Sequence, residues 1–376
     1  MPRDNSLEVF IRGFGQAKYE KNFDSSLKTE NKLTEATNLA LKQSGLKIKD
    51  IDGLGVSSFT LIPDRAIDLA VKFGIKPRWI MDGGTGGASG VDLAQHAMRA
   101  IQADDAKNIL LVAGDVFHND DFTNLVSHYN VNTEASSVNL GISGPNSNFA
   151  LLTEMQMSKH GLLKKDYSLL VRHQRDNAVR NANAVYRTPL SVEQYLTAPE
   201  VSRPLGIFDC VPVVAGANAI ILSKIKNENE LAVRIRKIAV LHNWDLHEGD
   251  GTVTGLSRLT ESIWEDTDLT RDDVNLLSLY DDYPAIVIAQ LIDLGFLKGE
   301  NVSEELQQFI AGSKPILNSS GGQLSAGQCG AGAGLHGFIE AMNGLRKGGI
   351  ALVSGYGMVV NRYGACSNLA ILEATR

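Results

Sequence analysis

The chain has 376 residues, of which 43% are hydrophobic and 21% charged, a composition typical of a globular protein long enough for two domains. The net charge of −7 and the lack of a Lys/Arg-rich cluster exclude a nucleic-acid backbone as the expected partner, and no apolar run reaches the ~20 residues of a membrane helix. Three cysteines without metal-ligand spacing, after a polar first segment, indicate a reduced, cytoplasmic protein with no secretory signal and no metal site.

The predicted elements of the first half recur in the second half. A helix that begins at Leu33 leads through an acidic turn to an apolar strand over 51–57. A helix that begins at Leu259 leads in the same way to an apolar strand over 274–280. A match of this kind indicates an internal repeat, although α/β units resemble one another in general.

A second pair of segments repeats in the same order. The glycine-rich turn 86–90 opens a helix that is followed by the apolar strand 108–114. The glycine-rich turn 330–334 opens another helix, which is followed by the apolar strand 349–355. Continuous apolar strands are typical of a sheet covered by helices on both faces. Two matches in one order favour duplication of an α/β unit over chance.

The repeats set the expected domain limits. The first copy closes with an apolar strand near 217–222, a polar segment follows, and the second copy begins at Leu231. We therefore predict an N-terminal half over 1–224 and a C-terminal half over 231–376. The region 118–203 has no counterpart in the second half, and so long an insertion is typical of a lid or wall of a functional site.

The two glycine-rich turns are the expected functional centre. A strand, a glycine turn and a helix bring backbone N–H groups and the positive end of the helix to one point, which stabilises anions. The first turn carries no Cys or Ser at its tip, and Ser89 is expected to cap its helix. In the second turn, Asn318 precedes a pair of glycines, and Gln328 could polarise a carbonyl but cannot act as a base.

These turns resemble the thiolase superfamily, specifically its sterol-carrier-protein-associated and archaeal-type branch, over nearly the whole chain. Gly87 stands where the family's Cys-Ala-Ser-Gly turn has its acyl-accepting cysteine. The family's Gly-His-Pro motif is changed so that Gln328 replaces the oxyanion-hole histidine, and Cys366 stands where related branches often carry histidine. The resemblance is also carried by Arg203 to Pro212, Gly216 to Ala219, Leu279 to Tyr283, and the intact Asn-x-x-Gly-Gly motif at Asn318, Gly321 and Gly322.

The resemblance implies an α/β thiolase-like fold, with two duplicated α/β halves in five layers (α-β-α-β-α) and an inserted loop domain. It also implies a coenzyme A thioester as substrate, no covalently bound cofactor, a homodimer, and a small zinc-ribbon/OB-fold protein as a partner. Because two of the family's catalytic side chains are replaced, thiolysis or Claisen condensation through an acyl-cysteine at the first turn is not expected.

One function compatible with these replacements is a carbon–carbon lyase of the retro-aldol type, which a branch of this family catalyses without the cysteine. Such a reaction needs a base for the substrate hydroxyl and a group that stabilises or protonates an enolate. Tyr280, Tyr283, Tyr356 and Tyr363 fall in segments that line the family's site. A buried tyrosine is also an ordinary packing residue, so each assignment depends on the geometry.

A second candidate is an acyltransferase whose nucleophile has moved to Cys366 or Cys329, with His336 as the nearest base in motif terms. A third is a non-catalytic subunit that binds an acyl-CoA or a small OB-fold partner in a complex. We predict as catalytic the side chains of Tyr280, Gln328, Cys366 and Tyr356. We predict as substrate-binding residues Gly87, Ser89, Asn318, Gly321, Gly322, His336 and Tyr283.

Overall fold

A computed structural model describes residues 8–127, 144–227, 232–244, 251–360 and 363–375. Its main feature is a ten-stranded sheet that consists of two five-stranded halves. The N-terminal half contains, from its outer edge, β3 (Trp79–Asp82), β2 (Gly53–Ser57), β4 (Asn108–Asp115), β7 (Gly216–Ser223) and β1 (Phe10–Gln16). The C-terminal half contains, in the corresponding order, β10 (Ile316–Leu317), β9 (Val274–Ser278), β11 (Gly349–Val360), β12 (Tyr363–Thr375) and β8 (Ala232–His242).

The pairing directions also repeat between the halves. In each half three outer strands run parallel, and the next strand pairs antiparallel with the third. The halves meet where β1 pairs antiparallel with β8, at Phe10 and Arg234. The equal strand order confirms the predicted duplication, and the observed strands lie within a few residues of the predicted ones.

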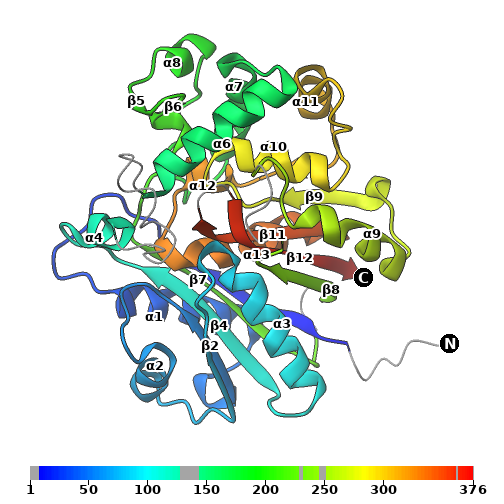
Figure 1. Cartoon of the computed structure of the whole chain (residues 1–376). Coiled ribbons are helices and arrows are strands. Elements are labelled where there is room, and N and C mark those ends of the chain that lie inside the picture. The colour runs from blue at the N-terminus through cyan, green and yellow to red at the C-terminus, as the bar shows by residue number, and fades with distance from the viewer. Residues whose placement is uncertain (1–7, 128–143, 228–231, 245–250, 361–362, 376) are drawn as a thin grey trace.

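Helices form three layers around the two half-sheets (Figure 1). α1 (Thr29–Ser44) and α2 (Arg65–Phe73) pack on the outer face of the N-terminal half, and α9 (Leu256–Thr267) and α10 (Pro284–Asp293) pack on that of the C-terminal half. Between the half-sheets lie α3 (Ser89–Gln102) and α13 (Ala333–Gly344). The predicted five-layered α/β fold is therefore confirmed.

Side-chain alternation explains why the strands read as continuous apolar runs. On β4, Leu110 and Val112 pack against the outer helices, whereas Ile109 and Leu111 pack against the central pair. Successive side chains of a strand point to opposite faces, so a strand covered on both faces needs apolar residues at every position. The consecutive apolar residues of these strands therefore follow from the helix layers that cover both faces of each half-sheet.

The two central helices cross where the repeated glycine turns meet. Each helix is preceded by a short 3-10 turn, η3 (Gly86–Ala88) and η7 (Gly330–Gly332), which begins at a glycine with a positive φ of 56° or 57°. A Cβ atom at Gly90 would lie 1.8 Å from the carbonyl oxygen of Gly334. Only glycine permits this approach, and it brings both turns to one point in the molecule.

A pair of equivalent asparagines fixes the two turns. The side-chain amide of Asn218 on β7 donates to the carbonyl of Gly332, and that of Asn368 on β12 donates to the carbonyl of Ala88, both at 2.9 Å. Both asparagines are fully buried. Each half therefore holds the glycine turn of the other half through a hydrogen bond that is shielded from water.

The region between β4 and β7 supplies most of the added helices. It contains α4 (Asp121–Ser127), α6 (Gly144–His160), α7 (Lys164–Ala178) and α8 (Val192–Leu196), with the short strands β5 (Glu200–Ser202) and β6 (Leu205–Gly206). α7 packs on α11 (Val302–Ala311) and α12 (Gly322–Ala326) of the C-terminal half. The remaining 3-10 turns are η2 (Ile48–Asp50), η5 (Ile207–Asp209), η6 (Arg271–Asp273) and η8 (Leu345–Lys347).

Among the helices of the described residues, none is both long and apolar enough to cross a lipid bilayer. Within the same residues, no group of three or more His, Cys, Asp or Glu side chains is arranged as a metal site.

Candidate active site

A cavity lies where the two glycine turns meet the ends of β9 and β11. Its empty volume is about 600 Å³, and part of this space is open to solvent. One side is apolar and comes largely from α4, and the other side carries polar groups of the C-terminal half. The described residues that line it are Phe59, Gly87, Phe122, Leu125, Val126, Pro145, Tyr280, Asp282, Gln328, Gly330, Tyr356 and Gly357. The structure thus brings together Gly87, Tyr280, Gln328 and Tyr356 from the predicted set.

The ring of Tyr280 occupies the space beside Gly87. A Cβ atom at Gly87 would lie 2.1 Å from Cζ and 2.2 Å from the hydroxyl oxygen of Tyr280. The backbone of Tyr280 is fixed on both sides, because its N–H donates to Ser354 Oγ at 2.9 Å and its carbonyl accepts from Gln290 Nε2 at 2.7 Å. A phenol therefore stands where any side chain at position 87 would have to lie.

Tyr280 belongs to a chain of polar groups at the cavity wall. Its hydroxyl donates to Asp282 Oδ2 at 3.0 Å, and Gln328 Nε2 donates to Asp282 Oδ1 at 2.5 Å. Burial raises the pKa of Asp282 to about 7, although these two hydrogen bonds partly oppose the shift. A carboxyl group with this pKa can exchange a proton near neutral pH, as a general base or acid must.

Asp282 was absent from the residues predicted from the sequence. Asp282 lies one position before Tyr283 in the segment that carries the family resemblance. The neighbouring Asp281 is also a carboxylate, but its side chain lies away from the cavity lining. Asp281 is buried and accepts from the N–H groups of Gln323 and Leu324 at the start of α12. Both aspartates lie in the loop between β9 and α10, and the backbone of this loop decides which of them reaches the cavity. Composition does not reveal this choice.

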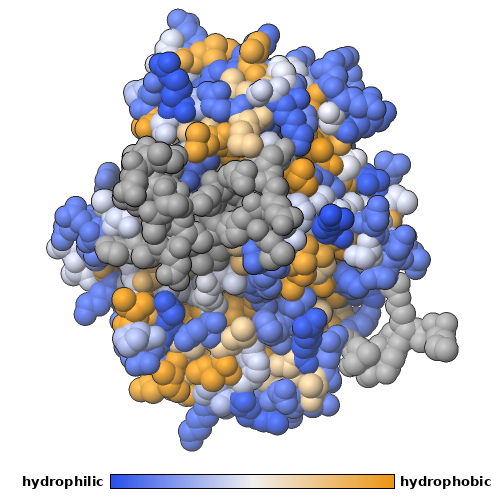
Figure 2. Space-filling view, viewed as in Figure 1, coloured by the Kyte–Doolittle hydropathy of each residue, from blue (hydrophilic) through white to orange (hydrophobic). Residues whose placement is uncertain are grey.

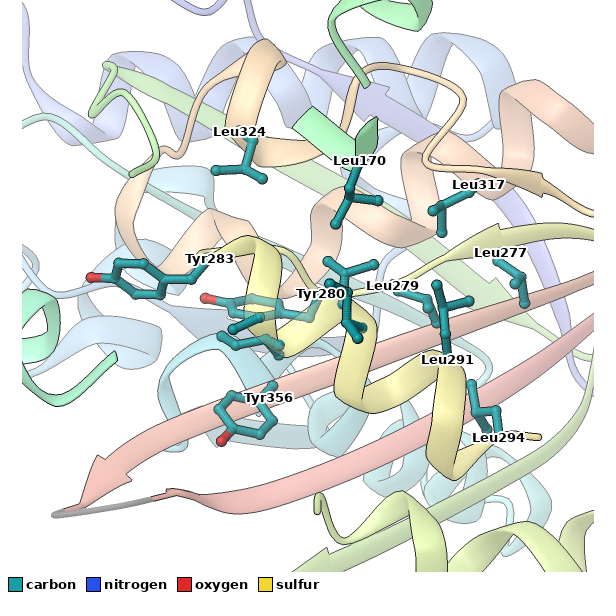
Figure 3. Packing of buried hydrophobic residues seen from close by; sticks show 14 of the residues in the cluster. Leu170, Leu277, Leu279, Tyr280, Tyr283, Leu291, Leu294, Leu317, Leu324 and Tyr356 are labelled. Atoms are coloured by element: carbon teal, nitrogen blue, oxygen red, sulfur yellow. The ribbon is translucent and has the colours of Figure 1, made fainter. Parts of the chain in front are cut away.

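Tyr356 reaches the cavity from β11. Its hydroxyl accepts a hydrogen bond from the N–H of Gly364, and its ring centroid lies 6.2 Å from that of Phe149 on α6. Figure 3 shows the hydroxyl groups of Tyr280, Tyr283 and Tyr356 on the same side of a packed group of leucines. Tyr356 is buried, so its phenol is held in one orientation by the surrounding core.

Tyr283 is separate from the cavity lining. Its hydroxyl donates to Asn146 Oδ1 at 2.6 Å, and its ring stacks on Phe149 at a centroid distance of 4.3 Å. Burial raises the pKa of this phenol well above its ordinary value. The role of Tyr283 in substrate binding stays a prediction, and its contacts are those of a core residue.

Four other predicted residues lie behind the cavity wall. Ser89 accepts from the N–H of Thr85 at 3.0 Å, so it fixes the first turn. The amide of Asn318 bonds to both the N–H and the carbonyl of Leu279, at 2.8 and 3.0 Å, and holds the segment before Tyr280. Two adjacent glycines with positive φ, Gly321 and Gly322, let the chain enter α12 close to Asp281. Their direct contact with a substrate stays a prediction.

The structure does not place His336 beside Cys366. His336 is buried between the hydroxyls of Tyr19 and Ser320, at 3.1 and 3.0 Å, and lines a different cavity. Burial lowers the pKa of His336 to about 4, so it is neutral at ordinary pH.

Cys366 lies directly opposite His242 in the β8–β12 pair and is only 6% exposed. Burial, followed by the charge of Asp92, raises its thiol pKa to about 12, and burial raises that of the fully buried Cys329 to the same value. These raised pKa values disfavour the thiolate that a nucleophilic cysteine needs. The catalytic role of Cys366 stays a prediction, and the burial of its thiol does not support that role.

Known proteins provide independent comparisons. Residues 239–358 match the family model "Thiolase C-terminal domain-like". The chain is 26% identical to the 17-hydroxy-3-oxo-4-pregnene-20-carboxyl-CoA lyase of Mycobacterium tuberculosis, with 91% of each chain covered. It is 23% identical to the steroid side-chain-cleaving aldolase of Thermomonospora curvata, with 97% of this chain and 94% of the relative covered.

Among solved structures, the chain is similar to the Ltp2-ChsH2(DUF35) aldolase, with a TM-score of 0.81, 21% identity and 98% of each chain covered. This likeness reports on the fold alone. It agrees with the two five-stranded halves, the central helix pair and the paired glycine turns described above. The comparisons confirm the resemblance of this chain to the thiolase superfamily, and residues 239–358 match the model of that family's C-terminal domain.

Proposed function

We propose that the chain is a lyase that cleaves the Cα–Cβ bond of a β-hydroxyacyl-CoA thioester by a retro-aldol reaction. The products are a ketone or aldehyde and a shortened acyl-CoA. The observation that carries this proposal is the phenol of Tyr280 in the space beside Gly87, bonded to Asp282. The names of the two bacterial relatives confirm the expectation of an enzyme that acts at a carbon–carbon bond of a CoA thioester.

The polar chain supplies the proton transfers. The substrate hydroxyl gives its proton to the oxygen of Tyr280, while Tyr280 gives its own proton to ionised Asp282. The C–O bond becomes a carbonyl, the Cα–Cβ bond breaks, and its electron pair forms the enolate of the thioester. A proton then returns to Cα, for which Tyr356 is the candidate donor across the cavity. The Tyr356 phenolate regains a proton from solvent and Asp282 releases the proton that it took, so no net proton is consumed. No oxidant, reductant or co-reactant is needed.

The internal repeat indicates where the enolate oxygen binds. In the second turn, the N–H of Ala331 donates to a carboxylate oxygen of Asp115 at 2.8 Å. The equivalent residue of the first turn is Gly87, which lines the cavity at the start of η3 and α3. A turn of the same geometry in this molecule therefore already holds an oxyanion, and we assign the thioester oxygen to the turn at Gly87.

The direct test is incubation of the pure protein with a panel of β-hydroxyacyl-CoA thioesters. Mass spectrometry of small molecules detects the shortened acyl-CoA and the carbonyl product, and mass spectrometry of the intact protein detects any acyl adduct. The proposal requires cleavage without an adduct. An adduct on a cysteine would favour the acyltransferase instead.

Replacing Asp282 with Asn should remove the pH dependence of cleavage near neutrality. In the wild type, kcat/KM should rise about tenfold per pH unit up to the Asp282 pKa of about 7 and then level off, because only ionised Asp282 accepts the proton. The variant should be slower by about 100-fold, with a flat profile through that range. Asp293→Asn is the matched control, because burial raises the pKa of Asp293 to about 7 as well, but this residue contacts Thr254 outside the cavity. If both variants keep the rising limb, Asp282 is not the group that titrates.

Replacing Cys366 with Ala tests the acyltransferase alternative. We expect turnover within about threefold of the wild type, because a buried thiol with a pKa near 12 carries almost no thiolate at pH 7. The measurement is the rate of product formation with the best thioester of the panel. A loss of 100-fold or more would restore Cys366 to the site.

The assembly is also part of the proposal. We expect a homodimer, and Figure 2 shows apolar side chains in the region where α2 lies in Figure 1. Ile67 and Val71 are exposed on α2, and Ile62 is exposed shortly before this helix. α2 contacts the edge strand β3. A small OB-fold partner is supported by the solved Ltp2-ChsH2(DUF35) aldolase, whose name includes a DUF35 component. Complete inactivity of the isolated chain, with retained acyl-CoA binding, would favour the non-catalytic subunit.

The cytoplasmic location stays a prediction.

A further inference from the structure

The mechanism uses only groups of the C-terminal half and the first glycine turn, yet a buried carboxylate of the N-terminal half adjoins the cavity from behind. We propose that Asp115 is a positioning residue that holds two cavity walls, Phe59 and the second glycine turn, against each other. By doing so it sets how the acyl group of the substrate fits. This inference rests on the proposed function for its kinetic test, and on geometry alone for its structural test.

One oxygen of Asp115 fixes the loop that carries Phe59. Oδ1 accepts from the hydroxyl of Ser58 at 2.7 Å and from the N–H of Phe59 at 2.8 Å. It also accepts from the N–H and the hydroxyl of Thr60, at 2.9 and 2.8 Å. The loop after β2 is thus bound around a single atom at the end of β4.

The other oxygen fixes the second glycine turn, which belongs to the C-terminal half. Oδ2 accepts from the N–H of Ala331 at 2.8 Å, and a Cβ atom at Gly330 would lie 2.3 Å from it. Both Phe59 and Gly330 line the cavity. One side chain therefore joins two walls that come from opposite halves of the molecule.

The contacts define the charge state that performs this task. Asp115 is fully buried, and all five of its contacts are donors. Burial raises the pKa of Asp115, but the backbone N–H groups of Phe59, Thr60 and Ala331 can only donate, so they favour the ionised form. The start of the helix at Ala331 adds a favourable partial positive charge.

We call the five hydrogen bonds to Asp115 the Asp115 clamp. Its loss should affect the binding of the acyl group more than the proton-transfer steps. Gln328 is held independently, because its N–H donates to the carbonyl of Pro212 and its carbonyl accepts from the N–H of Val214. The proton-transfer pair, Tyr280 and Asp282, is anchored in the C-terminal half as described above. Loosening the clamp should therefore raise KM for the thioester and change kcat little.

Asp115→Asn is the primary test. Asn has the same shape, but whichever way its amide points, an NH₂ group faces at least one N–H donor that the carboxylate accepted. We expect KM for a cleaved β-hydroxyacyl-CoA to rise about tenfold with kcat within about threefold. Hydrogen exchange measured by mass spectrometry should become faster in peptides that contain Phe59 and Ala331.

Asp52→Asn is the matched control. Asp52 also accepts backbone N–H groups between β2 and β4, those of Lys107 and Asn108, but at the opposite ends of the two strands. This variant should keep the wild-type KM and the wild-type exchange near the cavity. Should Asp115→Asn fail to fold, Thr60→Val removes one donor from the clamp and leaves the carboxylate in place, with an expected threefold rise in KM.

The outcomes separate the two proposals. The proposal for Asp115 would be overturned if Asp115→Asn left both KM and hydrogen exchange unchanged. It would also be overturned if Asp52→Asn changed KM and exchange to the same extent. If the wild type cleaves no thioester of the panel, the proposed function fails, and the exchange comparison alone still decides whether Asp115 joins the two walls.

Discussion

Replacing Tyr280 with Phe should lower kcat for cleavage by about 1,000-fold, leave KM nearly unchanged and cost about 1 kcal/mol of stability through the lost hydrogen bond to Asp282. The ring would still fill the space beside Gly87, so the packing is preserved, but the hydroxyl that contacts Asp282 would be gone. Removal of a positioned acid–base group costs about 100- to 10,000-fold in rate. Steady-state kinetics on the best thioester and a thermal melt together provide the measurement.

Tyr283→Phe is the matched control for this change. Tyr283 lies three residues further along, is equally buried, and donates its hydroxyl to Asn146 rather than to a cavity group. Its replacement should cost about 1 kcal/mol of stability through the lost hydrogen bond and leave turnover close to the wild type. Equal turnover in Tyr280→Phe and the wild type would remove Tyr280 from the reaction.

Most of the fold could be predicted from the sequence, because it follows from a repeated pattern of apolar residues and glycines. Each half repeats a helix, an apolar strand and a glycine turn, and each strand is apolar at consecutive positions because helices cover both of its faces. The meeting of the turns was also predictable in outline. Glycines at 90 and 334 occupy equivalent places, and only a close approach of two backbones gives glycine an advantage inside a helix.

The site was accessible only in part. The motif positions indicated Gly87, Tyr280, Gln328 and Tyr356, and the structure places all four at one cavity. Asp282 was missed because the sequence does not distinguish it from the neighbouring Asp281. The local backbone fixes the direction of each of these side chains, and the sequence pattern does not reveal that direction. His336 and Cys366 were linked through motif spacing, yet they lie in different surroundings, since spacing along two turns does not determine which faces meet.

The apolar side of the cavity shows a further limit. Phe122, Leu125 and Val126 come from α4 in the inserted region, which has no repeat partner in the second half. The length of the insertion predicted a lid or wall for the site, and residues of the insertion line this cavity. The particular residues depend on how a short helix packs across the turns, and neither periodicity nor family motif constrains that packing.

Restoring a cysteine at the first turn should fail to restore an acyl-enzyme. In Gly87→Cys, the new Cβ would lie within about 2 Å of the Tyr280 ring, and a buried ring fixed at its backbone cannot move aside without loss of packing. Overpacking of this kind costs about 1–3 kcal/mol. We expect a lower free energy of unfolding in urea, loss of cleavage, and no acyl adduct with acetyl-CoA by intact mass.

Gly84→Cys is the matched control, because the same thiol would stand in the same turn with no atom within 4 Å of its Cβ. It should unfold at the wild-type urea concentration. The double variant Gly87→Cys, Tyr280→Ala provides the decisive comparison. Its loss of stability should be smaller than the sum of the two single losses, since each change makes room for the other. With the ring gone, a cysteine at the start of α3 gains a lowered thiol pKa, and an acyl adduct becomes the expected result. Additive losses would mean that Tyr280 and position 87 do not share one space.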